Sequence, residues 1–175
     1  MSVEVDIIVS APAWEAIADL DALTERVVRQ CVATSGVRLA SDCEVSVSFC
    51  DDATIRALNA RWRRQDKPTN VLSFPTPGAP QAKPLLGDIV IAYETVAREA
   101  REHDRKLPDY VAYMVIHGFL HLIGYDHEVR AEAETMEALE QRVASALGLS
   151  DPYAGGALYD LAETNEPNEI HVDTK

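Results

Sequence analysis

Three of the five histidines in this 175-residue chain lie within eleven residues, at positions 117, 121 and 127. His117 and His121 are four residues apart, so in a helix their side chains share one face, with Cβ atoms about 5 to 6 Å apart. Two imidazoles at that spacing can bind one metal ion at about 2.0 Å each. The pair therefore predicts two ligands of a metal site.

His127 can join this pair only if the helix ends before it. In a continuous helix, six residues would turn His127 by about 240° from His121. Gly124 is placed to end the helix, because glycine adopts the left-handed conformation that reverses a chain after a helix. Three buried imidazoles without a metal or partners would each carry a desolvation cost. We therefore expect His117, His121 and His127 to bind one ion.

The ligand set indicates a catalytic ion rather than a structural one. Three neutral imidazoles leave a divalent ion with its full charge and one open position, where the pKa of a bound water is lowered toward ~7. A closed structural site would use four ligands. Zinc is the default ion, one per chain, although nickel, copper or another divalent ion would also accept imidazole ligands.

The spacing of the three histidines matches the pattern of the metzincin peptidases, H-E-x-x-H-x-x-G-x-x-H. The chain departs from that pattern at the residue after the first histidine, where Gly118 replaces the glutamate that serves as general base. A peptidase is therefore the weaker hypothesis. Asp126, beside the last histidine, is expected to be a turn residue or a partner of an imidazole N–H rather than a base.

A second candidate is a basic run that has four cations against one acid, Asp66. The cations are Arg61, Arg63, Arg64 and Lys67. Arginine suits bidentate contact with phosphate, and Trp62 offers a stacking face for an unpaired base. The alternative is that Trp62 is a core residue and the arginines form a solvated helix end, where positive charge favours the dipole. Taken alone, the segment favours this alternative.

Hydrophobic periodicity predicts the elements that position these residues. Alternation or β-rich composition predicts strands at about residues 3–9, 43–49, 71–74 and 86–92. Helices are predicted from 17 or 21 to 33, from Asp51 or Asp52 through Trp62, and over 94–104, 108–123 and 132–147. The helix over 108–123 has almost no polar face, so it is expected to be central and buried.

Composition limits the classes of function. Apolar residues make up 47% and charged residues 26%, as in globular proteins. The net charge of −13 argues against broad nucleic-acid binding, so any nucleic-acid contact must be local. The three cysteines are an odd set without C-x-x-C spacing and are expected to be small buried side chains; they are Cys31, Cys43 and Cys50. With no apolar run of ~20 residues and no signal-peptide pattern, we expect a cytoplasmic protein without a membrane span.

Several segments together resemble a known family. They are residues 117–127, Leu58-Asn59, Arg63, residues 66–75 and residues 87–89. In combination they closely resemble the YbeY family of bacterial endoribonucleases, also called rRNA maturation factors, over roughly residues 40–152. The tail after about Pro152 has no counterpart that can be placed.

The resemblance implies an endoribonuclease specific for single-stranded RNA, acting in maturation of the small-subunit rRNA 3′ end and in ribosome quality control. It also implies a zinc-like ion on the three histidines and a functional arginine at Arg63. The implied partners are single-stranded RNA, rRNA, and the small ribosomal subunit or its assembly proteins.

We therefore expect one α+β domain over residues 1–152, with a small mixed β-sheet packed against helices and the metal site at the end of the buried helix. Residues 153–175 are expected to form a disordered acidic tail. Arg63 would offset the charge that develops on the phosphate, while Arg61, Arg64 and Lys67 would bind substrate. The alternatives are a metzincin-like zinc peptidase, or a non-catalytic ribosome-assembly factor with a structural metal, because an acidic surface suits a protein partner.

Overall fold

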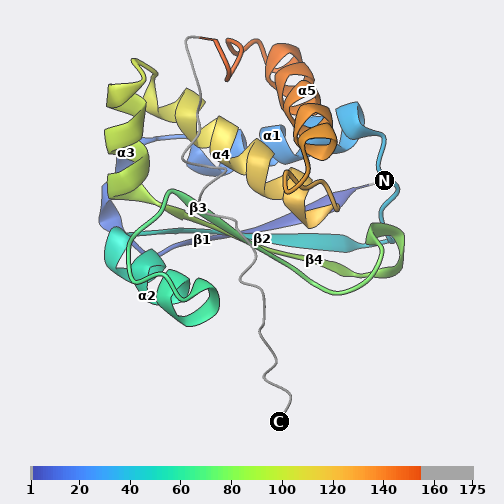
Figure 1. Ribbon diagram of the computed structural model, residues 1–175, viewed down its shortest axis with the longest axis horizontal. Coiled ribbons are helices and arrows are strands. Elements are labelled where there is room, and N and C mark those ends of the chain that lie inside the picture. The colour runs from blue at the N-terminus through green and yellow to red at the C-terminus, as the bar shows by residue number, and fades with distance from the viewer. Residues whose placement is uncertain (1, 155–175) are drawn as a thin grey trace.

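The fold is a four-stranded sheet with helices on both faces, seen in a computed structural model that describes residues 2–154 (Figure 1). The strands are β1 (Val3–Val9), β2 (Cys43–Cys50), β3 (Val71–Pro75) and β4 (Leu85–Ala92). The α-helices are α1 (Leu20–Ser35), α2 (Asp52–Arg63), α3 (Tyr93–Glu102), α4 (Leu107–Leu122) and α5 (Arg130–Ala146). Short 3₁₀ helices cover Pro12–Ala16 and Pro80–Ala82.

The sheet has the order β1-β2-β4-β3. β1 and β4 both run parallel to β2, whereas β3 pairs antiparallel with β4. β3 precedes β4 in the chain and yet lies outside it, at the edge of the sheet. The sheet is therefore mixed and the fold is α+β, which confirms the prediction.

The helices divide unequally between the two faces. α1, α3, α4 and α5 cover one face of the sheet, and α2 lies on the other (Figure 1). The main core, which includes Phe49 and Ile89, fills the space under the four-helix layer. A smaller cluster that includes Ile55, Leu72 and Val90 lies under α2. Because α2 packs on the opposite face from α4, it belongs to a separate layer from the helix that carries His117 and His121.

Helix α4 is the central element. It contacts α1, α3, α5, β3 and β4, and every residue from Tyr110 to Leu120 is buried. This confirms the prediction of a buried helix with almost no polar face. Since the last turns of α4 carry His117 and His121, packing on several sides fixes the backbone that positions them.

Local signals predicted the element boundaries well. β1 spans the predicted residues, and the Asp51 side chain caps α2 by accepting a hydrogen bond of 2.9 Å from the Thr54 amide. The three cysteines are buried free thiols, as expected. The tail predicted for 153–175 lies outside the described residues apart from Tyr153 and Ala154.

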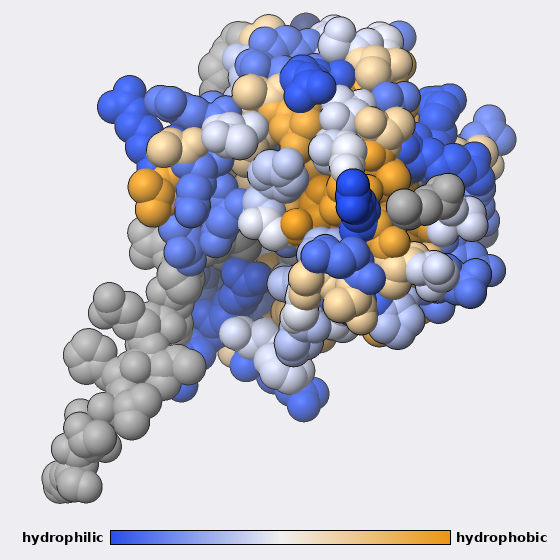
Figure 2. All heavy atoms as spheres, turned by 90° about the vertical axis from the view of Figure 1, so that its right-hand side faces the viewer, coloured by the Kyte–Doolittle hydropathy of each residue, from blue (hydrophilic) through white to orange (hydrophobic). Residues whose placement is uncertain are grey.

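The surface is mostly hydrophilic on the side that Figure 2 presents, which is the right-hand side of Figure 1. Apolar residues gather in the middle of this face and hydrophilic ones surround them. Apolar side chains therefore reach the surface at this side of the molecule. Within residues 2–154, none of the helices combines the length and the apolar character needed to span a bilayer.

Candidate metal centre

The three predicted histidines converge. One nitrogen from each of His117, His121 and His127 lies within 4.8 Å of the other two. The Nε2 atoms of His117 and His121 are 3.0 Å apart, and the His127 ring centroid lies 5.6 Å and 5.0 Å from those of His117 and His121. The structure thus brings together the three imidazoles that the spacing in the sequence predicted.

The chain reversal that brings His127 back is a Schellman motif. The Gly124 amide donates to the His121 carbonyl at 3.1 Å, and the Tyr125 amide donates to the Leu120 carbonyl at 3.0 Å. Gly124 has a φ of 104°, which a residue with a side chain rarely adopts. The helix therefore ends where the sequence predicted, and the reversal carries His127 toward the other two histidines.

Hydrogen bonds orient two of the rings. The Nδ1–H of His121 donates to the Tyr125 carbonyl at 2.9 Å, and the Nδ1–H of His117 donates to the Glu140 carboxylate at 3.3 Å. With a proton on each Nδ1, both Nε2 atoms direct their lone pairs toward one another. Such lone pairs repel at 3.0 Å, and a cation shared between them turns that repulsion into attraction.

The geometry fits a tetrahedral divalent ion. Two imidazole nitrogens on one zinc ion at about 2.1 Å lie about 3.4 Å apart, so the His117 and His121 rings need to separate by only a few tenths of an ångström. His117 is 3% exposed, and the other two rings are half-buried. The cluster is therefore accessible from one side, as a site with an open coordination position requires.

Electrostatics keep the rings in the form that binds metal. Burial, together with the positive charge of a protonated His117 or His127, lowers the pKa of His121 to about 2. Burial and His117 also lower the pKa of His127, against the raising effect of Asp126 and Glu140. A low pKa keeps both imidazoles neutral near pH 7, and the neutral imidazole is the metal ligand.

Gly118, where the metzincins have glutamate, faces the sheet. A Cβ atom at this position would lie 2.8 Å from Cγ2 of Ile89 and 3.2 Å from its Cγ1. The Ser73 hydroxyl donates to the Gly118 carbonyl at 3.4 Å, which ties β3 to the same turn of α4. Glycine at 118 thus permits close packing of α4 on β4, and a glutamate there would have to displace Ile89.

Gly118→Ala is expected to lower the free energy of unfolding by up to about 2 kcal/mol. Overpacking a core typically costs about 1–3 kcal/mol, which outweighs the ~1 kcal/mol that alanine gains over glycine in a helix. Urea unfolding of Gly118→Ala, Ile89→Ala and the double variant measures this effect. The double variant should lose less than the sum of the two, because Ile89→Ala removes the clashing atoms, and additive losses would refute the explanation.

Arg63 lies beside the histidine cluster. Its Nη2 donates to the Ser73 carbonyl at 3.3 Å, and its side chain is half-buried. Burial lowers the pKa of Arg63, whereas the nearby Asp126 carboxylate raises it. The charge of Arg63 also contributes to the low pKa of His121. These interactions place the guanidinium near the histidine cluster, although Arg63 belongs to the helix on the other face of the sheet.

The other cations of the basic run lie in two places. Arg61 and Arg64 are exposed at the end of α2, and the Arg61 guanidinium lies 5.0 Å from the centroid of the Trp62 ring. Trp62 is 59% exposed, so the hypothesis that it is a core residue is wrong. Its ring meets Phe74 edge-on at 6.4 Å. A large exposed aromatic side chain therefore adjoins the arginines.

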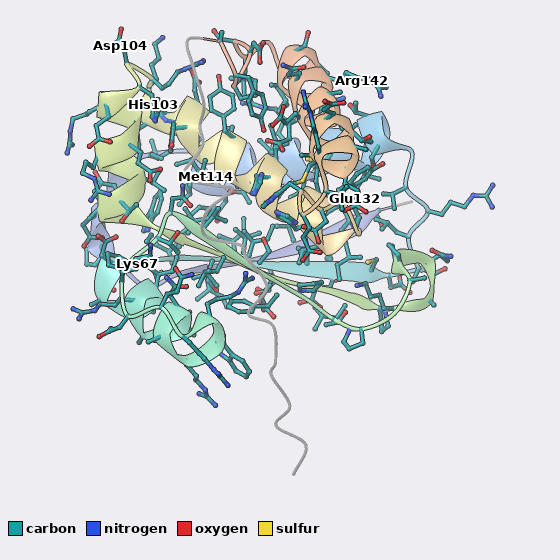
Figure 3. All side chains as sticks on the ribbon, in the orientation of Figure 1. Lys67, His103, Asp104, Met114, Glu132 and Arg142 are labelled. Carbon is teal, nitrogen blue, oxygen red and sulfur yellow. The ribbon has the colours of Figure 1, made fainter. Side chains whose placement is uncertain are left out.

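Lys67 follows α2 in the chain and lies beside an earlier turn of that helix. The Asn59 side chain donates to the Lys67 carbonyl at 2.9 Å, and Arg56 forms a bidentate ion pair with Asp66. Figure 3 shows Lys67 on the α2 side of the sheet. Residues 65–67 therefore run back beside α2. Lys67 is exposed, and it lies beside Asn59, about one helical turn before Arg63.

Hydrophobic periodicity did not single out Glu140, which is 3% exposed on α5 and accepts the hydrogen bond from His117. Its spacing places it on the same face of α5 as Met136, Leu139 and Val143, all of which are buried. A glutamate within an apolar stripe is a signal that could have identified it, because a buried carboxylate needs partners.

Comparisons with known proteins agree with this geometry. A model of the endoribonuclease YbeY family matches residues 11–148. Endoribonuclease YbeY of Methylocella silvestris is 55% identical over 149 residues, which cover 85% of each chain. The protein of the same name from Allorhizobium ampelinum is 49% identical over 159 residues, covering 87% of this chain and 95% of the relative.

The fold also has a counterpart among solved structures. The solution structure of a Thermotoga maritima protein, TM1509, has a TM-score of 0.51 and 26% sequence identity, and the match covers 85% of this chain and 97% of that chain. The family match extends over most of the described residues, and the histidine cluster lies within it. This chain belongs to the endoribonuclease YbeY family.

Proposed function

We propose that this protein is a metal-dependent endoribonuclease that hydrolyses phosphodiester bonds of single-stranded RNA. The observation that carries the proposal is the convergence of three imidazole nitrogens within 4.8 Å, next to the half-buried guanidinium of Arg63. The name endoribonuclease YbeY, which the relatives carry, supports RNA as the substrate.

Each site residue has a distinct role in this proposal. His117, His121 and His127 would hold one divalent ion, zinc by preference for its affinity for imidazole. Such an ion supplies Lewis acidity and an activated water. Arg63 would donate hydrogen bonds to the phosphate as negative charge develops on its oxygens, and its planar guanidinium suits two of them at once. The carboxylate of Asp126 would keep this guanidinium directed toward the site.

Substrate would approach along the exposed end of α2. Arg61 and Arg64 would bind neighbouring phosphates, with Lys67 contacting a more distant one. In a chain of net charge −13, this local positive charge supports a short, defined RNA contact rather than general binding. We propose that the RNA is the 3′ end of small-subunit rRNA, met in the cytoplasm on the small ribosomal subunit or with its assembly proteins.

Trp62→Ala is expected to raise the KM for single-stranded RNA about tenfold and to change kcat less. Stacking of a base on an aromatic side chain contributes about 1–3 kcal/mol, and 1.4 kcal/mol corresponds to a factor of ten. Because Trp62 is largely exposed, its loss should leave the unfolding midpoint nearly unchanged. Steady-state cleavage of a single-stranded oligoribonucleotide measures the effect.

Val129→Ala serves as the control for Trp62, since Val129 is exposed to a similar degree, 58%. Trp62→Phe should keep most of the affinity, because phenylalanine retains a stacking face. The only other tryptophan, Trp14, is 1% exposed, so quenching of fluorescence by RNA reports on Trp62. An unchanged KM together with unquenched fluorescence would rule out stacking.

One preparation can test the proposed function against its alternatives. The zinc-loaded protein and a His121→Ala variant are each incubated with single-stranded RNA and with casein. Cleavage of RNA alone by the unmodified protein supports the proposal, and cleavage of casein alone favours the peptidase. Cleavage of neither substrate favours a non-catalytic assembly factor with a structural metal.

A further inference from the structure

Glu140 is a buried carboxylate in the helical layer of the molecule. It is 3% exposed on α5, on the face that Met136 and Val143 pack into the core. Removing a carboxylate from water is costly unless hydrogen bonds or opposite charge compensate. The partners of Glu140 therefore indicate why a glutamate is placed there.

The two carboxylate oxygens of Glu140 have different partners. Oε1 accepts a hydrogen bond from Nδ1 of His117 at 3.3 Å, and Oε2 accepts one from the Tyr153 hydroxyl at 2.8 Å. Glu140 thus links the first metal-site histidine to a tyrosine that follows the last helix. The shorter bond to Tyr153 holds the carboxylate in the orientation that faces His117.

The segment that carries Tyr153, residues 150–154, is itself held in place. Nη2 of Arg105 donates to the carbonyls of Asp151 at 2.8 Å and Ala154 at 3.1 Å. Nη1 of Arg105 donates to the Tyr113 hydroxyl at 3.0 Å, and that hydroxyl donates to the Ser150 carbonyl at 2.9 Å. Groups from α4 and from the loop before it therefore fix this segment against the helical layer.

We propose that Glu140 and Tyr153 are positioning residues of the metal centre, and that the docked segment 150–154 raises the affinity of the three histidines for a divalent ion. The inference rests on the proposed function only in that the histidines bind metal. Glu140 keeps the proton of His117 on Nδ1, so that the Nε2 lone pair is directed at the ion. Its negative charge also offsets part of the charge of the ion.

Because Tyr153 donates a hydrogen bond to Glu140, the orientation of the Glu140 carboxylate depends on the segment 150–154. A carboxylate with one partner can rotate about its terminal torsion, and the tyrosine hydroxyl restricts that rotation. The segment 150–154 has no contact of its own with the ion in this proposal. It acts through Glu140, and its effect appears in metal affinity and in the tautomer of His117.

Zinc affinity tests the proposal in the full-length protein. Competition with a chromophoric chelator at pH 7.5 should show that Glu140→Gln binds zinc about 10- to 100-fold more weakly than the unmodified protein, the range typical of such partners. Tyr153→Phe removes one hydroxyl and should weaken binding by up to about tenfold. Glu132→Gln, an exposed position on the same helix, should bind zinc normally.

Two further measurements separate positioning from a general structural role. The unfolding midpoint of metal-free Tyr153→Phe should stay close to that of the unmodified protein, and ¹⁵N NMR should show a mixture of His117 tautomers in Glu140→Gln. Zinc affinity within twofold of the unmodified value in both variants would overturn the inference. If Glu140→Gln does not fold, Tyr153→Phe decides alone. Absence of zinc binding by the unmodified protein would instead refute the proposed metal site.

Discussion

Replacing His121 with alanine is expected to lower the bound divalent metal from about one equivalent per chain to less than about a tenth, and RNA cleavage at least ~10³-fold. In the proposed metal site His121 supplies one of three ligand nitrogens, and its Nε2 atom lies 3.0 Å from that of His117. Two imidazoles would bind the ion far more weakly. The ion stabilises the transition state by several kcal/mol, and each ~1.36 kcal/mol corresponds to a tenfold change in rate. Elemental analysis and single-stranded RNA cleavage measure the two losses.

His103→Ala is the matched control for His121→Ala. His103, labelled in Figure 3, is exposed after α3 and stacks on Tyr110 near the start of α4, whereas His117 and His121 lie near the end of that helix. The control removes an imidazole of the same kind and should keep both metal and activity. A His121→Ala variant that retains a full equivalent of metal would refute the three-histidine site, and one that loses metal while cleaving RNA normally would refute metal-dependent catalysis.

Arg63→Ala is expected to slow RNA cleavage by ~10²- to 10³-fold while the protein keeps its fold and its metal. A hydrogen-bond donor directed at charge that develops in the transition state typically contributes that much. Its bond to the Ser73 carbonyl is long at 3.3 Å, so stability should fall by no more than about 1 kcal/mol. Arg63→Lys should recover little activity, because an ammonium lacks the planar fork of donors. A fully active Arg63→Lys enzyme would show that bidentate contact is not the role.

A control variant can separate the loss of one positive charge from the specific role proposed for Arg63. Arg98→Ala removes one positive charge from the exposed face of α3, where Arg98 pairs with Glu102, and it should leave activity unchanged. The losses caused by Arg61→Ala or Arg64→Ala should shrink as salt is added, since salt screens exposed phosphate contacts. The loss caused by Arg63→Ala should persist in salt. Unfolding of Arg63→Ala would instead assign the residue a structural role.

Much of the local structure follows from the sequence. Alternating apolar residues gave β1 and β2, and the apolar run over 108–123 gave α4 to within a residue at each end. Gly124 marked the end of that helix, because a Schellman motif depends on a residue that accepts positive φ. Each of these features depends on hydrogen bonds between residues close in the chain, which a sequence pattern encodes directly.

Other features depend on which segments pack together. The exposure of Trp62 could not be predicted, because helical periodicity places it on the same stripe as Ile55, which is buried, and Leu58, which packs against the smaller core cluster. How far along this stripe the sheet covers the helix depends on tertiary packing. The close packing at Gly118 depends on Ile89, which comes from a strand nearly thirty residues earlier. The position of Lys67 depends on the chain turning back beside Asn59.

The sequence by itself determined which three histidines converge, the helix that carries two of them and the reversal that returns the third. Each depends on spacings of four to six residues, over which backbone geometry is almost fixed. Only the tertiary structure decided that Arg63 reaches the histidine cluster from the other face of the sheet, and that Glu140 accepts a hydrogen bond from His117. These contacts join residues 23 or more positions apart, and the packing of whole helices and strands, which no short-range pattern specifies, sets their geometry.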